Sequence, residues 1–185
     1  MKNKRCKICK EPFVARFSTL QTVCENPKCI LKNAEVVALK RTKADINRRR
    51  EAIKSVSQWR KEFQQVFNTY IRLRDSKQPC ISCNKPLPPK YDAGHYYSVG
   101  SYPNLRFNEY NVHAQCVVCN QHKSGNLLEY TAGIEARIGI EKLNELKSMR
   151  HLPLRLPLDE IKTGITLYKS KIKQIKNESR INPSQ

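Results

Sequence analysis

The chain has 185 residues, enough for one compact catalytic module with smaller attachments but not for a large multidomain enzyme. Its 35 lysines and arginines outnumber its 16 aspartates and glutamates, and the formal net charge is +19. Such a charge predicts a polyanionic partner, and nucleic acid is favoured over a membrane surface because no strongly apolar helix accompanies it.

The amino terminus gives a first indication of the compartment. Its ten residues, MKNKRCKICK, contain no apolar stretch like that of a signal peptide, and no apolar run in the chain approaches a membrane-spanning length. We therefore expect a cytoplasmic protein without a membrane partner. In that setting eight cysteines in close pairs indicate metal binding rather than disulfides.

Residues 1–38 contain the first four of these cysteines, and we predict that they form a small zinc knuckle. The spacing is Cys6-x2-Cys9, fourteen residues, then Cys24-x4-Cys29. Two close pairs of thiolates can complete the tetrahedral four-sulfur shell of a structural zinc site. Free buried thiols or disulfides are the alternative interpretation.

Residues 39–78 predict a basic amphipathic helix. Nine lysines and arginines lie between positions 40 and 61, and the run Arg48, Arg49 and Arg50 is a candidate DNA-binding site. The alternative is that this run is only a solvated face. Farther along, apolar residues recur with helical spacing and should pack on the next module; they are Trp59, Phe63, Val66, Phe67, Tyr70 and Ile71.

Residues 79–130 hold the second quartet, Cys80-x2-Cys83 and Cys116-x2-Cys119. Between the pairs we predict short strands over about 91–97 and 111–115, followed by a short helix that begins near Val117. Four thiolates leave no open position for water on a zinc ion, so neither quartet should be catalytic. Any chemistry is expected in what the second zinc holds in place.

Residues 131–185 predict a mostly helical region. Two helical stretches, about 127–138 and 141–149, are separated at Gly139. A further helix begins near Leu158, and its apolar residues repeat at spacings of three and four. The residues from about Asn177 onward are expected to be disordered.

The segment between and after the second cysteine pairs carries the most specific pattern. His95 is followed by Asn111 sixteen residues later and by Asn120 nine residues after that. This spacing, bracketed by the second quartet, resembles the HNH nuclease motif. More narrowly, DAGHYYSVG, LRF, NVHAQC and CNQHKSGN resemble the phage NinG family, also called Rap, of recombination nucleases. The resemblance covers roughly the first 130 residues.

The resemblance implies an α+β protein with a small zinc-stabilised ββα-metal nuclease core, an amino-terminal zinc knuckle and mostly helical flanks. It implies a DNA endonuclease that cuts branched recombination intermediates such as Holliday junctions and D-loops, in the cytoplasm of the host cell. Two Zn²⁺ ions would be structural, and Mg²⁺ or Mn²⁺ catalytic. Recombination proteins as partners and a dimeric state are compatible with the sequence.

The resemblance also assigns roles to residues. His95 would be the general base, since the ordinary pKa of histidine lets it accept a proton near neutrality. Asn111 would orient the His95 ring, and Asn120 would coordinate the catalytic ion through its amide oxygen, a ligand type that hard ions prefer. Lys123 is a candidate phosphate contact, although an ordinary solvated lysine is equally compatible with the sequence.

One position departs from the usual HNH pattern. Many such nucleases place an acidic or histidine metal ligand directly before the general base, where this chain has Gly94. Asp92 is the nearest carboxylate, and we predict it as the second ligand of the catalytic ion. His122 and His113 are the alternatives.

Two other functions fit the same residues. The first is a zinc-finger protein that binds DNA without cutting it, such as a phage regulator, with both quartets serving only to fold the chain. The second is an RNA-binding zinc protein, for which Tyr96, Tyr97 and Tyr102 would provide stacking surfaces.

Overall fold

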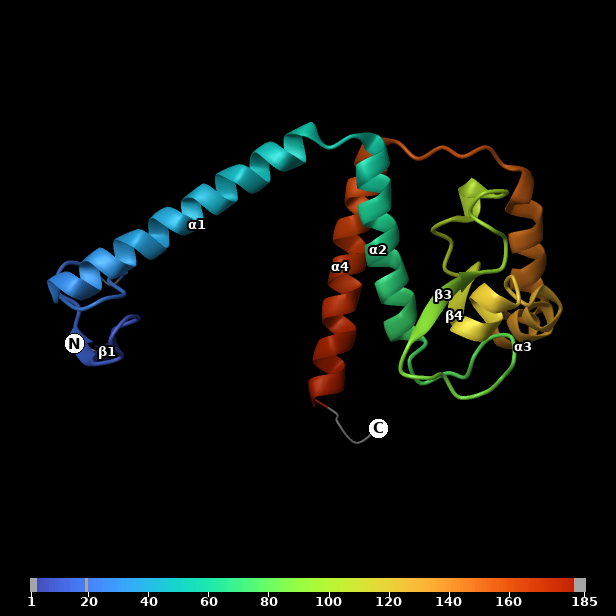
Figure 1. Ribbon diagram of the computed structural model, residues 1–185, viewed down its shortest axis with the longest axis horizontal. Helices are drawn as coiled ribbons and strands as arrows, with labels where there is room; N and C mark the ends of the chain where they lie inside the picture. Colours follow the sequence, from blue (N-terminus) through green and yellow to red (C-terminus); the bar gives the residue numbers. More distant parts are fainter. Residues whose placement is uncertain (1–2, 19, 182–185) are drawn as a thin grey trace. The chain divides into compact units, whose positions relative to one another are not determined.

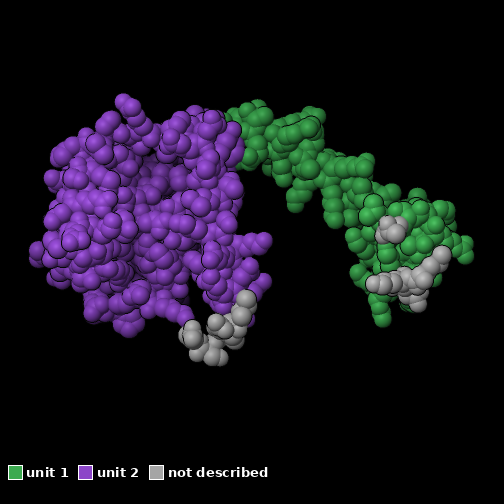
Figure 2. Space-filling model, turned by 180° about the vertical axis from the view of Figure 1, so that it is seen from behind, with its two compact units in different colours: residues 1–54 green, residues 55–185 purple. Residues whose placement is uncertain are grey.

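The computed structural model describes residues 3–18 and 20–181. The chain forms two compact units, divided between Lys54 and Ser55 (Figures 1 and 2). The described residues form mainly helices, together with two small antiparallel sheets. A mixed α and β protein that is mainly helical is therefore confirmed.

The first unit begins with a two-stranded antiparallel sheet. β1 (Asn3–Arg5) pairs with β2 (Pro12–Val14), and the long helix α1 (Pro27–Ile53) follows. Asn26 caps α1, because its side-chain oxygen accepts the N–H of Lys28 at 2.9 Å. Pro27 at the first helical position costs no hydrogen bond, since that N–H would have no partner within the helix.

The segment predicted as one helix over 39–78 is divided into two. After α1 ends at Ile53, Ser55 starts α2 (Val56–Arg74) with a capping box. The Ser55 hydroxyl accepts the N–H of Gln58 at 3.3 Å, and the Gln58 side-chain oxygen accepts the N–H of Ser55 at 2.7 Å. This reciprocal pair satisfies two backbone donors and gives α2 its own amino terminus.

The core of the second unit forms where α2 packs against α4 (Leu158–Ile181) and against the sheet that follows α2. Phe63 and Phe67 of α2 are buried, as the helical spacing predicts, and Phe63 stacks on Phe107 with centroids 3.8 Å apart. Gly164 lets α4 approach α2 closely, because a Cβ there would lie 2.4 Å from the Phe63 ring. The predicted apolar face therefore makes the main helix contact.

The second sheet consists of β3 (Tyr91–His95) and β4 (Val112–Cys116), which run antiparallel. Asp92 faces Gln115 across the pair. The connection contains the short 3-10 helix η1 (Pro103–Leu105), and β4 leads directly into the π-helix η2 (Val118–His122). Both predicted strands are present, and the predicted short helix is this π-helical turn.

Helix α3 (Leu127–Ser148) bends sharply at Gly139, where a helix break was expected, and it ends in the 3-10 turn η3 (Met149–His151). Gly139 has φ 81° and ψ 160°, a conformation that glycine adopts readily because it has no side chain. Buried residues of α3, including Tyr130 and Ile134, form a second core cluster with Ile81 and Leu105. This cluster supports the loop that carries Cys80 and Cys83.

The expectation of disorder from about Asn177 is wrong for residues 177–181, which extend α4. Contacts between successive turns continue there: Gln174 Nε2 donates to Glu178 at 3.2 Å, and the Ser179 hydroxyl donates to the Ile175 carbonyl at 2.9 Å. Residues 182–185 lie outside the described part. No described helix combines the length and apolar character needed to cross a membrane.

Candidate functional site

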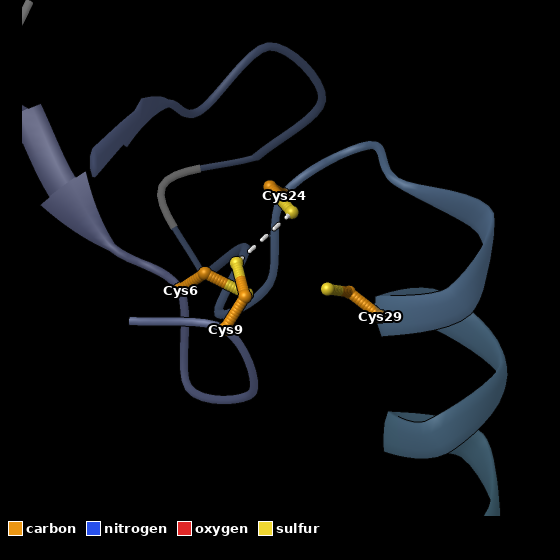
Figure 3. Close-up of side chains that lie close together, drawn as sticks. All are labelled: Cys6, Cys9, Cys24 and Cys29. Carbon is orange, nitrogen blue, oxygen red and sulfur yellow. Dashed lines mark hydrogen bonds between the residues drawn. The ribbon is translucent and has the colours of Figure 1, made fainter. Parts of the chain in front are cut away.

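The first cysteine quartet brings four sulfur atoms together in the first unit (Figure 3). Cys6 and Cys9 lie in the turn after β1, Cys24 precedes α1, and Cys29 lies in the first turn of that helix. The four sulfur atoms lie within 4.8 Å of one another, and those of Cys9 and Cys24 are 3.8 Å apart. Zinc–sulfur bonds of about 2.3 Å in a tetrahedron place the sulfurs about 3.8 Å apart, so the quartet fits zinc.

The second quartet lies where β4 ends. The sulfur atoms of Cys83 and Cys116 are 3.9 Å apart, and the Cys116 N–H donates to the Cys80 sulfur at 3.3 Å. Cys119 lies in η2, so a shared zinc ion would join the loop over 80–83, the end of β4 and η2. None of the eight cysteines, all of which lie in the described part of the chain, forms a disulfide, and both quartets could hold zinc.

The backbone beside one cysteine of each quartet favours the thiolate, the form in which cysteine binds a metal. Burial raises the pKa of Cys80, but hydrogen bonds from the N–H groups of Cys83, Cys116 and Ser82 have the larger, opposite effect. The pKa of Cys80 is therefore lowered to about 7. In the same way burial raises the pKa of Cys6, while the N–H groups of Cys24, Cys9 and Ile8 bring it to about 6. Backbone N–H groups thus stabilise a thiolate at one sulfur of each quartet, whereas burial raises the pKa of Cys29 and of Cys119 to about 12.

His95 is the last residue of β3, and its ring contacts a backbone carbonyl. Nε2 lies 3.1 Å from the carbonyl oxygen of Arg106, which can only accept a hydrogen bond. Nε2 must therefore carry the hydrogen, and Nδ1 of the neutral ring keeps its lone pair. Burial lowers the pKa of His95 and so does the nearby Arg106 guanidinium, although the carbonyls of Arg106 and Ala93 oppose the shift. The ring is therefore neutral at neutral pH.

Asn111 is fully buried and holds the loop between the two strands. Its Nδ2 donates to the carbonyls of Tyr97 and Leu105 at 3.0 and 3.1 Å, and its Oδ1 accepts the N–H of Tyr97 at 2.8 Å. Leu105 directly precedes Arg106, whose carbonyl contacts His95. Among the described residues no hydrogen bond joins Asn111 to the His95 ring, and Asn111 instead holds the loop that leads to the Arg106 carbonyl.

Asp92 and Asn120 lie next to each other. Asn120 Nδ2 donates to Asp92 Oδ2 at 2.8 Å, and Gln121 Nε2 donates to the same oxygen at 2.7 Å. The structure thus brings together the two residues that the sequence predicts as ligands of the catalytic ion, one from β3 and one from η2. Within residues 3–18 and 20–181, only the two cysteine quartets group three or more His, Cys, Asp or Glu ligands. An ion at Asp92 would therefore need amide, water or phosphate oxygens as well.

The glycine that departs from the HNH pattern has a structural reason. The Gln115 side chain covers Gly94, and a Cβ at that position would lie 2.1 Å from Gln115 Oε1. Gln115 is fully buried and fixed, because its Nε2 donates to the Ser82 hydroxyl at 2.6 Å and to the Gly125 carbonyl at 2.7 Å. A larger metal ligand therefore cannot occupy position 94 without displacing Gln115.

The two alternative histidines lie in different surroundings. His113 is only 2% exposed, its Nδ1 lies 3.4 Å from the Tyr130 hydroxyl, and burial lowers its pKa to about 3. It lines a cavity of about 700 Å³ together with Arg74 and Arg137. His122 is exposed at the end of η2, and Lys123 follows it, also exposed. Among the described contacts, none joins these three residues to Asp92.

The predicted DNA-binding arginines lie on the exposed surface of α1. Arg48 and Arg49 both pair with Asp45, at 2.6 and 2.9 Å, yet their side chains remain 82% and 79% exposed. Exposed ion pairs of this kind are weak, so either arginine can release the Asp45 carboxylate and bind another anion in its place. Arg50 is exposed as well, so all three side chains can reach a phosphate.

Sequence reasoning missed Arg106, whose carbonyl selects the tautomer of His95. No residue type signals such a contact, because every residue carries a carbonyl. It also missed the buried pair of Arg74 and Asp75, in which Asp75 accepts the Ala114 N–H at 2.9 Å and Arg74 donates to the Val112 carbonyl at 2.8 Å. This pair attaches the end of α2 to β4.

Comparison with known proteins places the chain among bacteriophage proteins. The family described as "Bacteriophage Lambda NinG protein" matches residues 1–178, beyond the roughly 130 residues covered by the motif resemblance. No solved structure matches the chain.

Named relatives agree with the family match. "Protein ninG" of Escherichia phage 933W is 37% identical over 190 aligned residues, which cover 94% of each chain. "Protein ninG" of Escherichia phage lambda is 46% identical over 129 residues, 70% of this chain and 63% of the lambda protein. The protein of the same name from Salmonella phage P22 is 44% identical over the same length. The chain therefore belongs to the NinG family of bacteriophage proteins.

Proposed function

We propose that this NinG family member is a metal-dependent DNA endonuclease of the HNH class that cuts branched DNA such as Holliday junctions and D-loops. One observation carries the proposal. The neutral His95 ring, fixed by the Arg106 carbonyl, lies on the same short strand as Asp92, which is hydrogen-bonded to Asn120. A poised base and a pair of oxygen ligands are the two components that phosphodiester hydrolysis requires.

In the proposed reaction Nδ1 of His95 accepts a proton from a water molecule as that water attacks the phosphorus atom. Nε2 keeps its hydrogen bond to the Arg106 carbonyl, which stabilises the positive ring that results. A divalent ion such as Mg²⁺ or Mn²⁺, held by Asp92 and the amide oxygen of Asn120, would stabilise the charge on the phosphate and on the departing oxygen.

The positions of the two components on β3 suit this division of work. Side chains three residues apart on a strand point to opposite faces, so the side chains of Asp92 and His95 lie on opposite faces of β3. In-line displacement needs the attacking water and the departing oxygen on opposite sides of phosphorus. A phosphate that lies across β3 would thus meet the base on one side and the ion ligands on the other.

The remaining parts of the chain support DNA as the substrate. The net charge of +19 and the exposed arginines of α1 suit a phosphate backbone. The two cysteine quartets, each with four sulfur ligands, suit structural zinc with no open position for water. Their proposed role is to hold the loops and strands that carry the site.

A cleavage assay tests the proposal. The zinc-loaded protein is incubated with a labelled four-way junction, a linear duplex, single-stranded DNA and a matched RNA junction, with and without added Mg²⁺. Cleavage of the DNA junction only with Mg²⁺ supports the nuclease. Binding of DNA that is equal with and without Mg²⁺, with no cutting, would instead identify a DNA-binding zinc protein. Preference for RNA would identify an RNA-binding one.

Two variants assign the residues. His95→Ala should reduce the cleavage rate about a hundredfold to ten-thousandfold, with DNA affinity and zinc content unchanged. Asn120→Ala should be partly rescued by more Mg²⁺ or by Mn²⁺, because it weakens the binding of an ion rather than removing the base. If folded His95→Ala protein cuts junctions at the wild-type rate, the HNH assignment is wrong.

A further inference from the structure

Two arginines lie on segments that pack against each other, and one of these segments contacts His95. Arg106 contacts the His95 ring through its own carbonyl, and Arg60 lies on α2. Phe63, one turn after Arg60, stacks on Phe107, the residue after Arg106, with ring centroids 3.8 Å apart. Consistent with this, burial lowers the pKa of Arg106, and the positive charge of Arg60 lowers it further. The stacked rings thus bring the segments that carry the two arginines side by side.

Neither guanidinium group has an anionic partner in the part of the chain that the structure describes. The Nε atoms of Arg60 and Arg106 are both buried without a hydrogen-bond acceptor. Arg74, only a few turns away on α2, is the contrasting case, because it pairs with Asp75 and donates to two backbone carbonyls. Two neighbouring positive charges that are partly buried and lack a counter-charge are costly, and a bound anion removes that cost.

Arg60 also begins a polar line along α2. Arg60, Gln64, Asn68 and Arg72 are spaced four residues apart, which places them on one side of the helix. Buried Gln64 Oε1 lacks a partner too, while Gln64 Nε2 donates to Asn68 at 2.7 Å.

The two ends of this line are tied to the two ends of β3. Near Arg72, the Tyr91 hydroxyl donates to the Arg72 carbonyl at 2.8 Å, and Tyr91 begins β3. Near Arg60, Arg106 contacts His95, which ends β3. Helix α2 therefore runs along the strand that carries the candidate site (Figure 1).

We infer that Arg60 and Arg106 together bind one phosphate group of the DNA backbone beside His95. The inference rests on the proposed function, since it names the groups with which that site holds its substrate. Guanidinium groups suit the task because their planar N–H donors can bind two phosphate oxygens at once. Arg106 has a double role: its side chain holds the phosphate while its carbonyl orients the base.

Phosphate binding can be measured without any cleavage. In protein with ¹⁵N-labelled arginine, the Nε–H signals of Arg60 and Arg106 should shift when inorganic phosphate is added, and that of Arg74 should not. The signals are assigned from Arg60→Gln and Arg106→Gln. If neither signal moves at phosphate concentrations that shift other surface arginines, the inference is wrong.

Junction binding provides the second readout, with Mg²⁺ omitted. Arg60→Gln and Arg106→Gln should each weaken binding roughly tenfold and lower the slope of log affinity against log salt by about one. Lys61→Gln is the matched control, because it removes the same charge from the next, exposed position of α2 and should have a smaller effect. Arg60→Lys and Arg106→Lys, which keep the charge, should recover part of the affinity. Losses no larger than that of Lys61→Gln would contradict the inference.

The outcomes separate this inference from the proposed function. If His95→Ala abolishes cleavage while the arginine variants behave like Lys61→Gln, the nuclease stands and the phosphate site is wrong. If both arginine signals respond to phosphate but the wild-type protein never cuts DNA, the phosphate site stands and the nuclease is wrong. Unchanged melting temperature and zinc content are required of each variant, so that a folding defect is recognised as such.

Discussion

The ring of His95 makes its hydrogen bond to a carbonyl oxygen of the chain rather than to a carboxylate. A carboxylate partner would raise the pKa of the ring and favour its charged form. A carbonyl fixes the same tautomer without adding a full negative charge, and burial and the Arg106 guanidinium lower the pKa. The proposed base is therefore available at and below neutral pH.

This environment predicts the pH dependence of cleavage. The base works only when neutral, so the rate should fall as pH drops through the pKa of His95, and that midpoint should lie below 6.5, the ordinary value. Arg106→Gln removes a positive charge that disfavours the charged ring, so the midpoint should move to higher pH. Single-turnover rates with saturating protein measure the profile. An acid limb above 6.5 in the wild type, or one that Arg106→Gln shifts downward, would contradict this account.

At the scale of elements, the buried pair of Arg74 and Asp75 attaches α2 to β4. Arg74 donates to both carboxylate oxygens of Asp75 at 2.7 and 3.0 Å, and Asp75 also accepts the Ala114 N–H. Burial raises the pKa of Asp75, but Arg74 and the Ala114 N–H together lower it by more than burial raises it. The carboxylate is therefore charged in the folded state. β4 is thus held in register with the helix that packs behind it.

Removing the carboxylate should destabilise the fold. Asp75→Ala leaves the half-buried Arg74 guanidinium with only its longer ion pair to Glu109, at 3.9 Å, and the loss of a buried partner costs about 3–5 kcal/mol. Thermal or urea unfolding measures the change, with Glu145→Ala, which breaks an exposed pair with Lys142, as the control that should alter stability little. Because the folded pKa of Asp75 is lowered, its contribution is complete above the unfolded value near 3.9 and is lost as pH falls through the folded pKa. A small effect of Asp75→Ala would show that the pair is not a main link.

The second cysteine quartet draws its four sulfur atoms from three segments of the chain. It would connect the loop over 80–83, the end of β4 and η2, the element that carries Asn120. Cys116→Ser should therefore remove one zinc ion and unfold this region, because the binding energy of a structural zinc is folding energy. Elemental analysis and circular dichroism check both effects, with the exposed Ser101→Ala as a control. Well-folded wild-type protein that contains no zinc would contradict the prediction.

At the scale of the whole molecule, positive charge is distributed over both units. The exposed arginines of α1 lie in the first unit, whereas the candidate site lies entirely in the second. Phosphate contacts in the first unit would therefore add affinity without taking part in the chemistry. The two activities should respond separately to mutation.

Replacing Arg48, Arg49 and Arg50 together with alanine tests this separation. Binding to all DNA shapes should weaken, and the slope of log affinity against log salt should decrease by about one for each lost phosphate contact. The rate of cleavage at saturating protein should stay close to that of the wild type, because His95 and Asp92 are unchanged. An unchanged salt slope would show that these arginines form only a solvated face.

Much of this architecture could be predicted from the sequence, because the relevant signals are local. The cysteine spacing predicts both quartets, since ligand type and short loops are properties of a few neighbouring residues. The apolar spacing from Trp59 to Ile71 predicts the buried face of α2, because helical periodicity is written directly in the chain. The pairing of Asp92 with Asn120 also agrees with the predicted ligand set.

The contacts that define the candidate site depend on tertiary structure. The carbonyl of Arg106 contacts His95 after a loop residue that Asn111 holds, and Phe63 of α2 stacks on Phe107, the residue after Arg106. The side chain over Gly94 likewise comes from the neighbouring strand. Periodicity and spacing depend only on residues that are close to one another in the sequence. A tautomer, an unpaired charge and an excluded side chain depend instead on groups that only folding brings into contact.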